Sequence, residues 1–199
     1  MAPKAGNATG SPTVRNAAAP LAHRVAGALA ALEAKATRRD LENLTRFGIT
    51  ATRAIGVSMA NIRLIARPIG RDHELALGLW ADGLYEARML ATLVDDPKLV
   101  TPSQMDAWCR DFDNWAICDT ACFALFDQTP HAFLKAKTWA GRKGEYQRRA
   151  AFALLASAAL HRKQDGDEPY LEGLSLIEAA SDDGRNFVKK GVNWALRGI

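Results

Sequence analysis

Apolar residues recur at intervals of three and four along most of the chain after its first twenty residues. This is the pattern of helices that bury one face. Residues 21–36 are an example, because Leu21, Val25, Leu29 and Leu32 fall on one side of a helix. No stretch alternates apolar and polar residues between turn signals, so the sequence requires no strand. It therefore predicts an all-α protein.

Capping residues and helix breakers divide this pattern into separate helices. Asp72 is a helix-capping residue, and Thr101-Pro102-Ser103-Gln104 is a helix start in which the Gln104 side chain is expected to reach back to the Thr101 amide. Pro68-Ile69-Gly70, Gly83, Thr129-Pro130 and Gly141 are expected breaks. The expected helices cover about 21–36, 38–46, 58 to the break at 68–70, 73–81, 84–95, 102–112, 114–127, 131–140, 144–161, 169–180 and 184–197.

From residue 72 onwards the expected helices form pairs with short connections. Antiparallel pairs stacked side by side make an α-solenoid of HEAT-like type. A globular bundle is the alternative, which an odd number of helices or a long helix buried on all faces would favour. We expect one HEAT-like domain over residues 21–199. Residues 1–20 are expected to be a disordered basic arm, for which a transit peptide is the alternative.

The charge of the chain is unevenly distributed. The 199 residues carry a net charge of +4, but residues 1–39 hold six Lys or Arg and one acid, which leaves the remainder at about −1. Overall charge therefore does not argue for nucleic-acid binding, and local clusters must carry that argument. One such cluster is found within residues 128–149, which contain a single acid and six basic residues: Lys135, Lys137, Arg142, Lys143, Arg148 and Arg149.

The cysteines and the missing motifs narrow the chemistry. Cys109, Cys118 and Cys122 are an odd number without CxxC spacing, so neither a disulfide framework nor a Cys-rich zinc site is expected. Cys118 and Cys122 share a helical face and are expected to be buried thiols, which fits a reducing, cytoplasmic location. No apolar run is long enough to span a membrane. The common signatures of metalloproteases, serine hydrolases and nucleotide-binding loops are absent, and neither a metal nor a cofactor is expected.

Trp115 and Asp119 are the most informative candidates for chemistry. Their spacing of four places an indole and a carboxylate one turn apart on one helical face, where they could stabilise a cation. A salt bridge or a bond to a neighbouring helix end is the alternative role for Asp119. Trp194, near Lys190, is a second candidate binding surface. Trp80 and Trp139 stand among apolar residues and are expected to be core.

Two pairs of basic residues are candidate phosphate ligands. Arg148 and Arg149 stand at the start of an apolar helix, and a guanidinium group matches the geometry of a phosphate. The alternative is that one arginine is solvated while the other bridges to an acid. Lys189 and Lys190 are either a solvated turn or contacts to a nucleic-acid backbone.

Three motifs occur in a fixed order: Asn114-Trp115-Ala116-Ile117-Cys118-Asp119, Arg148-Arg149-Ala150-Ala151-Phe152, and the segment 186–197 with Trp194. Together they resemble the bacterial DNA alkylation repair glycosylases of HEAT-like repeat type, the AlkD-like family. The segment from Arg71 to Leu77 and the residues after it resemble the same family. The resemblance covers roughly residues 40–199.

The resemblance implies a helical solenoid with a concave basic groove for duplex DNA, and excision of cationic purines such as 7-alkylguanine and 3-methyladenine. Trp115 and Trp194 match the aromatic positions that cradle the sugar of the lesion. Asp119 matches the catalytic carboxylate, and Arg149 matches the arginine that holds the DNA backbone. We expect a monomer whose partner is alkylated duplex DNA. The alternative is a non-catalytic HEAT-like module that binds DNA or a protein.

Overall fold

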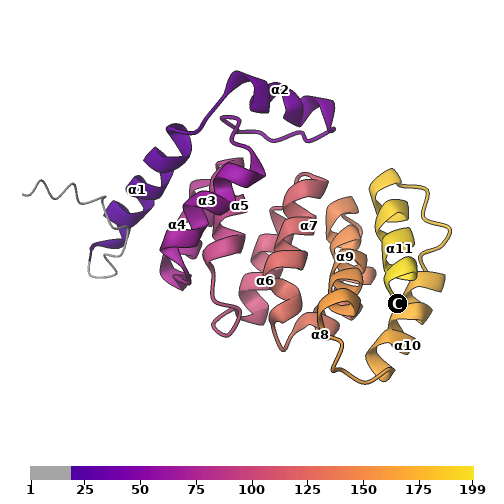
Figure 1. Ribbon diagram of the computed structural model, residues 1–199. Coiled ribbons are helices and arrows are strands. Elements are labelled where there is room, and N and C mark those ends of the chain that lie inside the picture. The colour runs from indigo at the N-terminus through magenta and orange to yellow at the C-terminus, as the bar shows by residue number, and fades with distance from the viewer. Residues whose placement is uncertain (1–18) are drawn as a thin grey trace, which may run out of the picture.

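The computed structural model describes residues 19–199, which contain helices and no strand (Figure 1). The all-α prediction is confirmed. None of these helices combines the length and apolar character that a membrane span requires. The expected arm over residues 1–20 lies outside the described residues except for its last two. The helices are α1 (Leu21–Glu33), α2 (Arg38–Arg46), α3 (Met59–Ile69), α4 (His73–Asp82), α5 (Tyr85–Val94), α6 (Pro102–Arg110), α7 (Trp115–Ala124), the 3₁₀-helix η1 (Phe126–Gln128), α8 (Ala132–Ala140), α9 (Glu145–His161), α10 (Glu168–Glu178) and α11 (Asn186–Gly198).

Helix starts follow the predicted caps, with one difference. The side chain of Asp72 accepts a hydrogen bond from the Leu75 amide at 3.0 Å, and Thr101 accepts one from the Gln104 amide at 3.1 Å. The Gln104 side chain was expected to return to the Thr101 amide, but its Nε2 donates to Asp95 Oδ2 at 2.6 Å instead. Asp95 is fully buried, so leaving its carboxylate without hydrogen-bond donors would be costly. The amide of the exposed residue Thr101 can bond to water instead.

The helices are stacked in pairs, which confirms the predicted arrangement. Helices α3, α5, α7, α9 and α11 lie side by side in a row, which we call the odd-numbered row (Figure 1). Helices α4, α6, α8 and α10 alternate with them along the chain and pack against this row. The short connections make each consecutive pair antiparallel.

Two features expected of a globular bundle are also present. The described residues contain eleven α-helices, and most of the long helix α9 is buried. The burial of α9 has a simple cause within the stack, because α7 and α11 flank it in the odd-numbered row and α8 packs against it from the other layer. An odd number of helices and a buried α9 are therefore as compatible with a stack two layers deep as with a globular bundle.

The core contains the tryptophans that the sequence assigns to it. Trp80 and Trp139 are buried, as predicted, and the Trp80 ring stacks on that of Trp108 with centroids 3.9 Å apart. The predicted burial of Cys118 and Cys122 is also confirmed, and Cys109 is buried and unpaired as well. Aromatic packing of this kind fixes neighbouring helix pairs at close range.

Helix α2 differs from the other helices because it has no buried residue. In Figure 1 it lies apart from the odd-numbered row, above it in the view. Its N-cap residue, Thr37, donates its amide hydrogen to the Gly56 carbonyl at 2.7 Å. Gly56 has a φ of 82°, and a Cβ there would lie 2.4 Å from both Thr37 O and Leu41 N. Only glycine can therefore occupy this crossing point.

Candidate functional site

Asp119, the predicted catalytic carboxylate, lies in the middle of α7 and forms a two-point ion pair with Arg149 of α9. Arg149 Nε donates to Oδ1 at 2.7 Å, and Nη2 donates to Oδ2 at 2.6 Å. The Asp119 side chain is 19% exposed and that of Arg149 is 7% exposed. Each carboxylate oxygen has two lone pairs, so the ion pair leaves Asp119 able to accept further hydrogen bonds on its accessible side.

Arg149 also connects α9 to α11. Its Nη1 donates to the Phe187 carbonyl at 2.8 Å, so one guanidinium group joins α7, α9 and α11. Gly191 allows this approach, because a Cβ there would lie only 3.3 Å from Arg149 Cγ. Nη1 and Nη2 each carry a second N–H that these bonds do not use. Contact between Arg149 and a DNA backbone stays a prediction.

The two partners influence each other's proton affinity. Burial raises the pKa of Asp119 above its ordinary value, while the hydrogen bonds and charge of Arg149 act in the opposite direction. Burial alone would lower the pKa of Arg149, but the hydrogen bonds and charge of Asp119 raise it. The guanidinium therefore stays protonated, and Asp119 is the member of the pair that titrates on acidification.

Trp115 is the first residue of α7, one turn before Asp119 on the same face. The preceding residue, Asn114, caps the helix: its side-chain oxygen accepts the amides of Ala116 and Ile117 at 3.0 and 3.1 Å. Asn114 is fully buried. Trp115 is half-buried, and its Nε1 donates to the Phe47 carbonyl, just after α2, at 3.1 Å. A remote segment therefore holds the indole.

Trp194 lies on α11, which runs parallel to α9 in the odd-numbered row. The register of the two helices follows from two close approaches, in which Gly191 packs on Arg149 and Gly198 packs on Ala156. Trp194 is therefore about one turn beyond the level of Arg149, and it is half-buried. The structure thus brings Asp119 and Arg149 into contact and places Trp115 and Trp194 on the two helices that Arg149 joins to α9.

The remaining predicted DNA-binding residues differ in their surroundings. Arg148 is bound to Asp183 at 2.8 Å. Hydrogen bonds and charge from Arg185, assisted by the charge of Arg148, hold the pKa of Asp183 well below its usual range. Lys189 and Lys190 are exposed on α11, and neither forms an ion pair with another residue in the range 19–199. The lysines are the more accessible of the predicted backbone contacts.

Three partners of these residues were not anticipated from the sequence: the carbonyls of Phe47 and Phe187, and the carboxylate of Asp183. Backbone carbonyls leave no signal in a sequence, because every residue has one. Asp183 stands in the segment Asp182-Asp183-Gly184, which reads as a helix break. Nothing in that segment indicates that only the second aspartate is buried.

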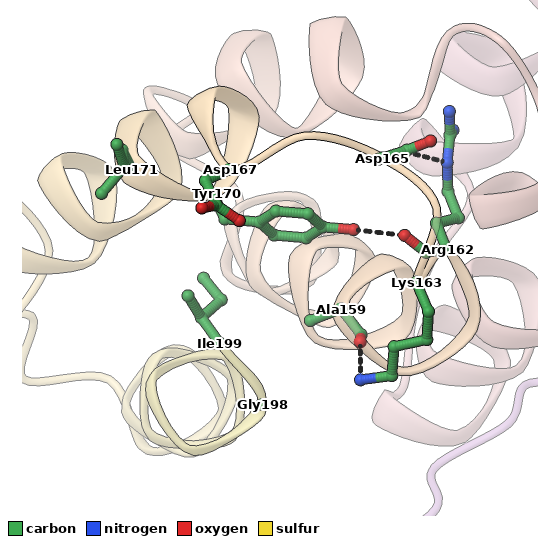
Figure 2. Close-up of a pocket in the computed structure, with 9 residues that line it drawn as sticks. All are labelled: Ala159, Arg162, Lys163, Asp165, Asp167, Tyr170, Leu171, Gly198 and Ile199. Carbon is green, nitrogen blue, oxygen red and sulfur yellow. Dashed lines mark hydrogen bonds and ion pairs between the residues drawn. The ribbon is translucent and has the colours of Figure 1, made fainter.

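A cleft of about 370 Å³ lies elsewhere, between the end of α9, the start of α10 and the end of α11 (Figure 2). Tyr170 points into it and donates its hydroxyl to the Arg162 carbonyl at 3.2 Å, and Arg162 is paired with Asp165. None of the predicted site residues lines this cleft. The described part of the chain also holds no group of three or more His, Cys, Asp or Glu side chains that could bind a metal ion.

Comparisons with known proteins agree with this arrangement. A family model described as DNA alkylation repair enzyme matches residues 28–199. A solved structure, described as a new family of proteins related to the HEAT-like repeat DNA glycosylases with affinity for branched DNA structures, superposes with a TM-score of 0.78. The two sequences are 21% identical, and the superposition covers 87% of this chain and 74% of the chain in the solved structure. This similarity shows the HEAT-like fold. No curated protein matched the chain.

Proposed function

Because the chain belongs to the DNA alkylation repair enzyme family, we propose that it excises cationic alkylated purines from duplex DNA by hydrolysing the N-glycosidic bond. The observation that carries this proposal is the position of Asp119. Its carboxylate is held by Arg149, lies one turn from Trp115, and retains an exposed side. An ionised, oriented carboxylate beside an indole is suited to stabilising a sugar cation.

The charge of the substrate determines which groups the reaction needs. A 7-alkylguanine or 3-methyladenine base already carries a positive charge, so the electron pair of the breaking bond neutralises it and no acid is required. The deoxyribose is left as an oxocarbenium ion. Asp119 stabilises this ion, orients the water that attacks C1′, and accepts the proton that the water loses. Removing such a stabiliser commonly costs about 3–4 kcal/mol in the barrier.

Trp115 and Trp194 contribute through the faces of their rings. An indole face attracts a cation, which is worth about 0.5–2 kcal/mol for each contact. Both tryptophans are half-buried, so they have packing that fixes them and surface that a sugar can contact. We propose that they flank the sugar and the charged base.

The basic residues hold the DNA backbone in this proposal. Lys189 and Lys190 are exposed and make the first contacts. Arg148 and Arg149 add positive charge to the same surface. Each is already paired with an acid, Arg148 with Asp183 and Arg149 with Asp119, so a phosphate would share them with these carboxylates. Contacts to phosphate carry no base information, so preference for the sequence around the lesion is slight. The monomeric state and the cytoplasmic location stay predictions.

A non-catalytic DNA-binding module is the second candidate. Two observations favour it: the structural neighbour is described by its affinity for branched DNA, and both oxygens of Asp119 are already bonded to Arg149. In that case the ion pair is structural, and the exposed lysines contact the phosphates of a junction.

One experiment separates the two candidates. The purified protein is incubated with duplex DNA that contains 7-methylguanine, and released base is measured. Binding to an unmodified four-way junction and to a matched duplex is measured in parallel. We expect base release at a rate well above spontaneous depurination. No release, together with tighter binding to the junction than to the duplex, supports the second candidate and overturns the first.

A further inference from the structure

Glu86 of α5 is a fully buried carboxylate outside the site described above. It forms no ion pair with any of the residues that the structure describes. Instead it accepts hydrogen bonds from three consecutive backbone amides, with Oε1 at 2.7 Å from Gly56 N, 3.2 Å from Ile55 N and 3.3 Å from Val57 N. A buried carboxylate is costly unless it is hydrogen-bonded, so this group has a specific partner: the segment before α3.

The segment that Glu86 holds is also the anchor for the start of α2. Gly56 donates its amide hydrogen to Glu86, and its carbonyl accepts the amide hydrogen of Thr37, the N-cap of α2. The close crossing of Gly56 and Leu41 leaves no space between the two segments. Moving Gly56 therefore moves the start of α2.

The other end of α2 reaches the candidate site. Phe47 follows the last residue of the helix, and its carbonyl accepts the indole hydrogen of Trp115 at 3.1 Å. Because α2 has no fully buried residue and only Leu44 of this helix packs partly against the core, its position depends largely on what holds its two ends. A continuous path thus runs from Glu86 through Gly56 and α2 to the Trp115 ring.

We propose that Glu86 is a positioning residue for Trp115: it anchors α2, and α2 presents the Phe47 carbonyl that orients the indole. The consequence for catalysis rests on the proposed function, while the consequence for the indole does not. In Glu86→Gln one side-chain oxygen still accepts, but the negative charge is lost and an NH2 group faces the Ile55 amide that Oε2 accepted. The hold on the segment is therefore weaker, and the segment shifts. The Trp115 N–H then loses its bond for part of the time, and the ring samples other orientations.

The test is hydrogen exchange of indole N–H groups by NMR in Glu86→Gln, with the Trp115 signal assigned from Trp115→Phe. We expect Trp115 to exchange roughly tenfold faster than in the unsubstituted protein. The Trp80 indole, which donates to Asp111, serves as the internal reference and stays unchanged. Glu42→Gln is the matched control, because it removes the same charge from an exposed pair on α2 itself. An unchanged Trp115 exchange rate in a folded Glu86→Gln protein overturns the proposal.

A second readout tests the catalytic consequence. If the protein releases base, Glu86→Gln slows single-turnover release by roughly 2- to 30-fold, the range of one cation–π contact, and leaves duplex affinity unchanged. Glu86→Asp, which keeps a carboxylate, recovers part of both the rate and the protection of the indole. If the unsubstituted protein releases no base, the proposed function fails, but the exchange experiment still decides the role of Glu86.

If Glu86→Gln does not fold, hydrogen exchange of the unsubstituted protein still tests the proposal. If Glu86 anchors Trp115 through α2, the Gly56 amide and the Trp115 indole open together and have equal free energies of exchange in mild denaturant. A Trp115 indole that stays protected after the Gly56 amide has opened contradicts the proposal.

Discussion

At the residue scale, Asp119 forms the salt bridge that the sequence left as the alternative to a catalytic role, and this contact is compatible with the proposed catalysis. A carboxylate in the middle of an apolar helix needs a partner when it is buried, and Arg149 supplies two hydrogen bonds and a charge. The same contact keeps Asp119 in one rotamer, which a catalytic group also needs. The sequence indicated both residues, but their direct contact depends on helix packing that no local motif encodes.

The first prediction concerns pH. Burial raises the pKa of Asp119, and the reaction needs its ionised form. Base release is therefore fully active above this pKa and declines as pH falls through it, at a pH above the ordinary aspartate value of about 3.9. A raised carboxylate pKa means that the folded state binds the proton more tightly, so protonation of Asp119 does not unfold the protein.

The pH–rate profile of single-turnover release, after subtraction of spontaneous depurination, checks this prediction. Circular dichroism at each pH serves as the control for folding. A rate that stays constant down to the ordinary aspartate range, or that falls only with the helical signal, contradicts it.

The second prediction concerns stability. Arg149→Met leaves Asp119 as a buried carboxylate without its partner, which we expect to lower the free energy of unfolding by about 3–5 kcal/mol. Adding Asp119→Asn removes the unpaired charge and recovers part of that loss. Urea denaturation of the two single variants and the double variant measures the coupling. Additive losses would mean that the two side chains do not interact as the structure indicates.

At the element scale, helix positions followed from caps and breakers to within a few residues. Asp72, Thr101 and Gly83 act locally, so their signals can be read from the sequence. The Gln104 side chain was mispredicted because its choice between the Thr101 amide and Asp95 depends on the burial of Asp95, which is a tertiary property. The role of Glu86 was missed for the same reason: an acid among apolar residues gives no indication of which backbone amides it will meet.

The third prediction concerns the cap of the helix that carries the site. Asn114→Ala removes the acceptor for two amides at the start of α7, and because Asn114 is fully buried we expect a loss of about 1–2 kcal/mol. Thr101→Ala, at the exposed cap of α6, is the matched control and should cost less. Thermal unfolding measures both. An equal or larger loss for Thr101→Ala would show that burial does not determine the strength of the cap.

At the scale of the whole molecule, the stacking of helix pairs followed from short connections and one-sided apolar faces. The stack brings α7, α9 and α11 side by side, so residues far apart in sequence gather on one row. The sequence did not indicate that Phe47, just after α2, contacts Trp115 of α7. The helix α2 is polar, and the acceptor of this hydrogen bond is a backbone carbonyl, which leaves no signal in a sequence. Local sequence patterns therefore predict the stacked helix pairs better than they predict the contacts of α2 and Phe47.

The fourth prediction concerns DNA binding by the assembled row. Each cation that neutralises a phosphate contributes about 0.9 to the slope of log affinity against log salt. We expect the double variant Lys189→Gln/Lys190→Gln to reduce the slope of log affinity against log salt by nearly twice the contribution of one cation. The free energy of unfolding should not change, because both lysines are exposed. Lys163→Gln, on the loop beside the cleft of Figure 2, is the control that leaves the slope unchanged. Equal slopes for the double variant and the unsubstituted protein would remove these lysines from the interface.

The central claim, that the Asp119 carboxylate stabilises a sugar cation during excision, is tested most directly by single-turnover release of 7-methylguanine from a duplex. The comparison is between the unsubstituted protein, Asp119→Asn, and Asp182→Asn as an exposed aspartate of the same charge. We expect Asp119→Asn to be slower by roughly 100- to 1000-fold with duplex affinity nearly unchanged, and Asp182→Asn to match the unsubstituted protein. Equal release rates for Asp119→Asn and the unsubstituted protein, or no release by either, would contradict the claim.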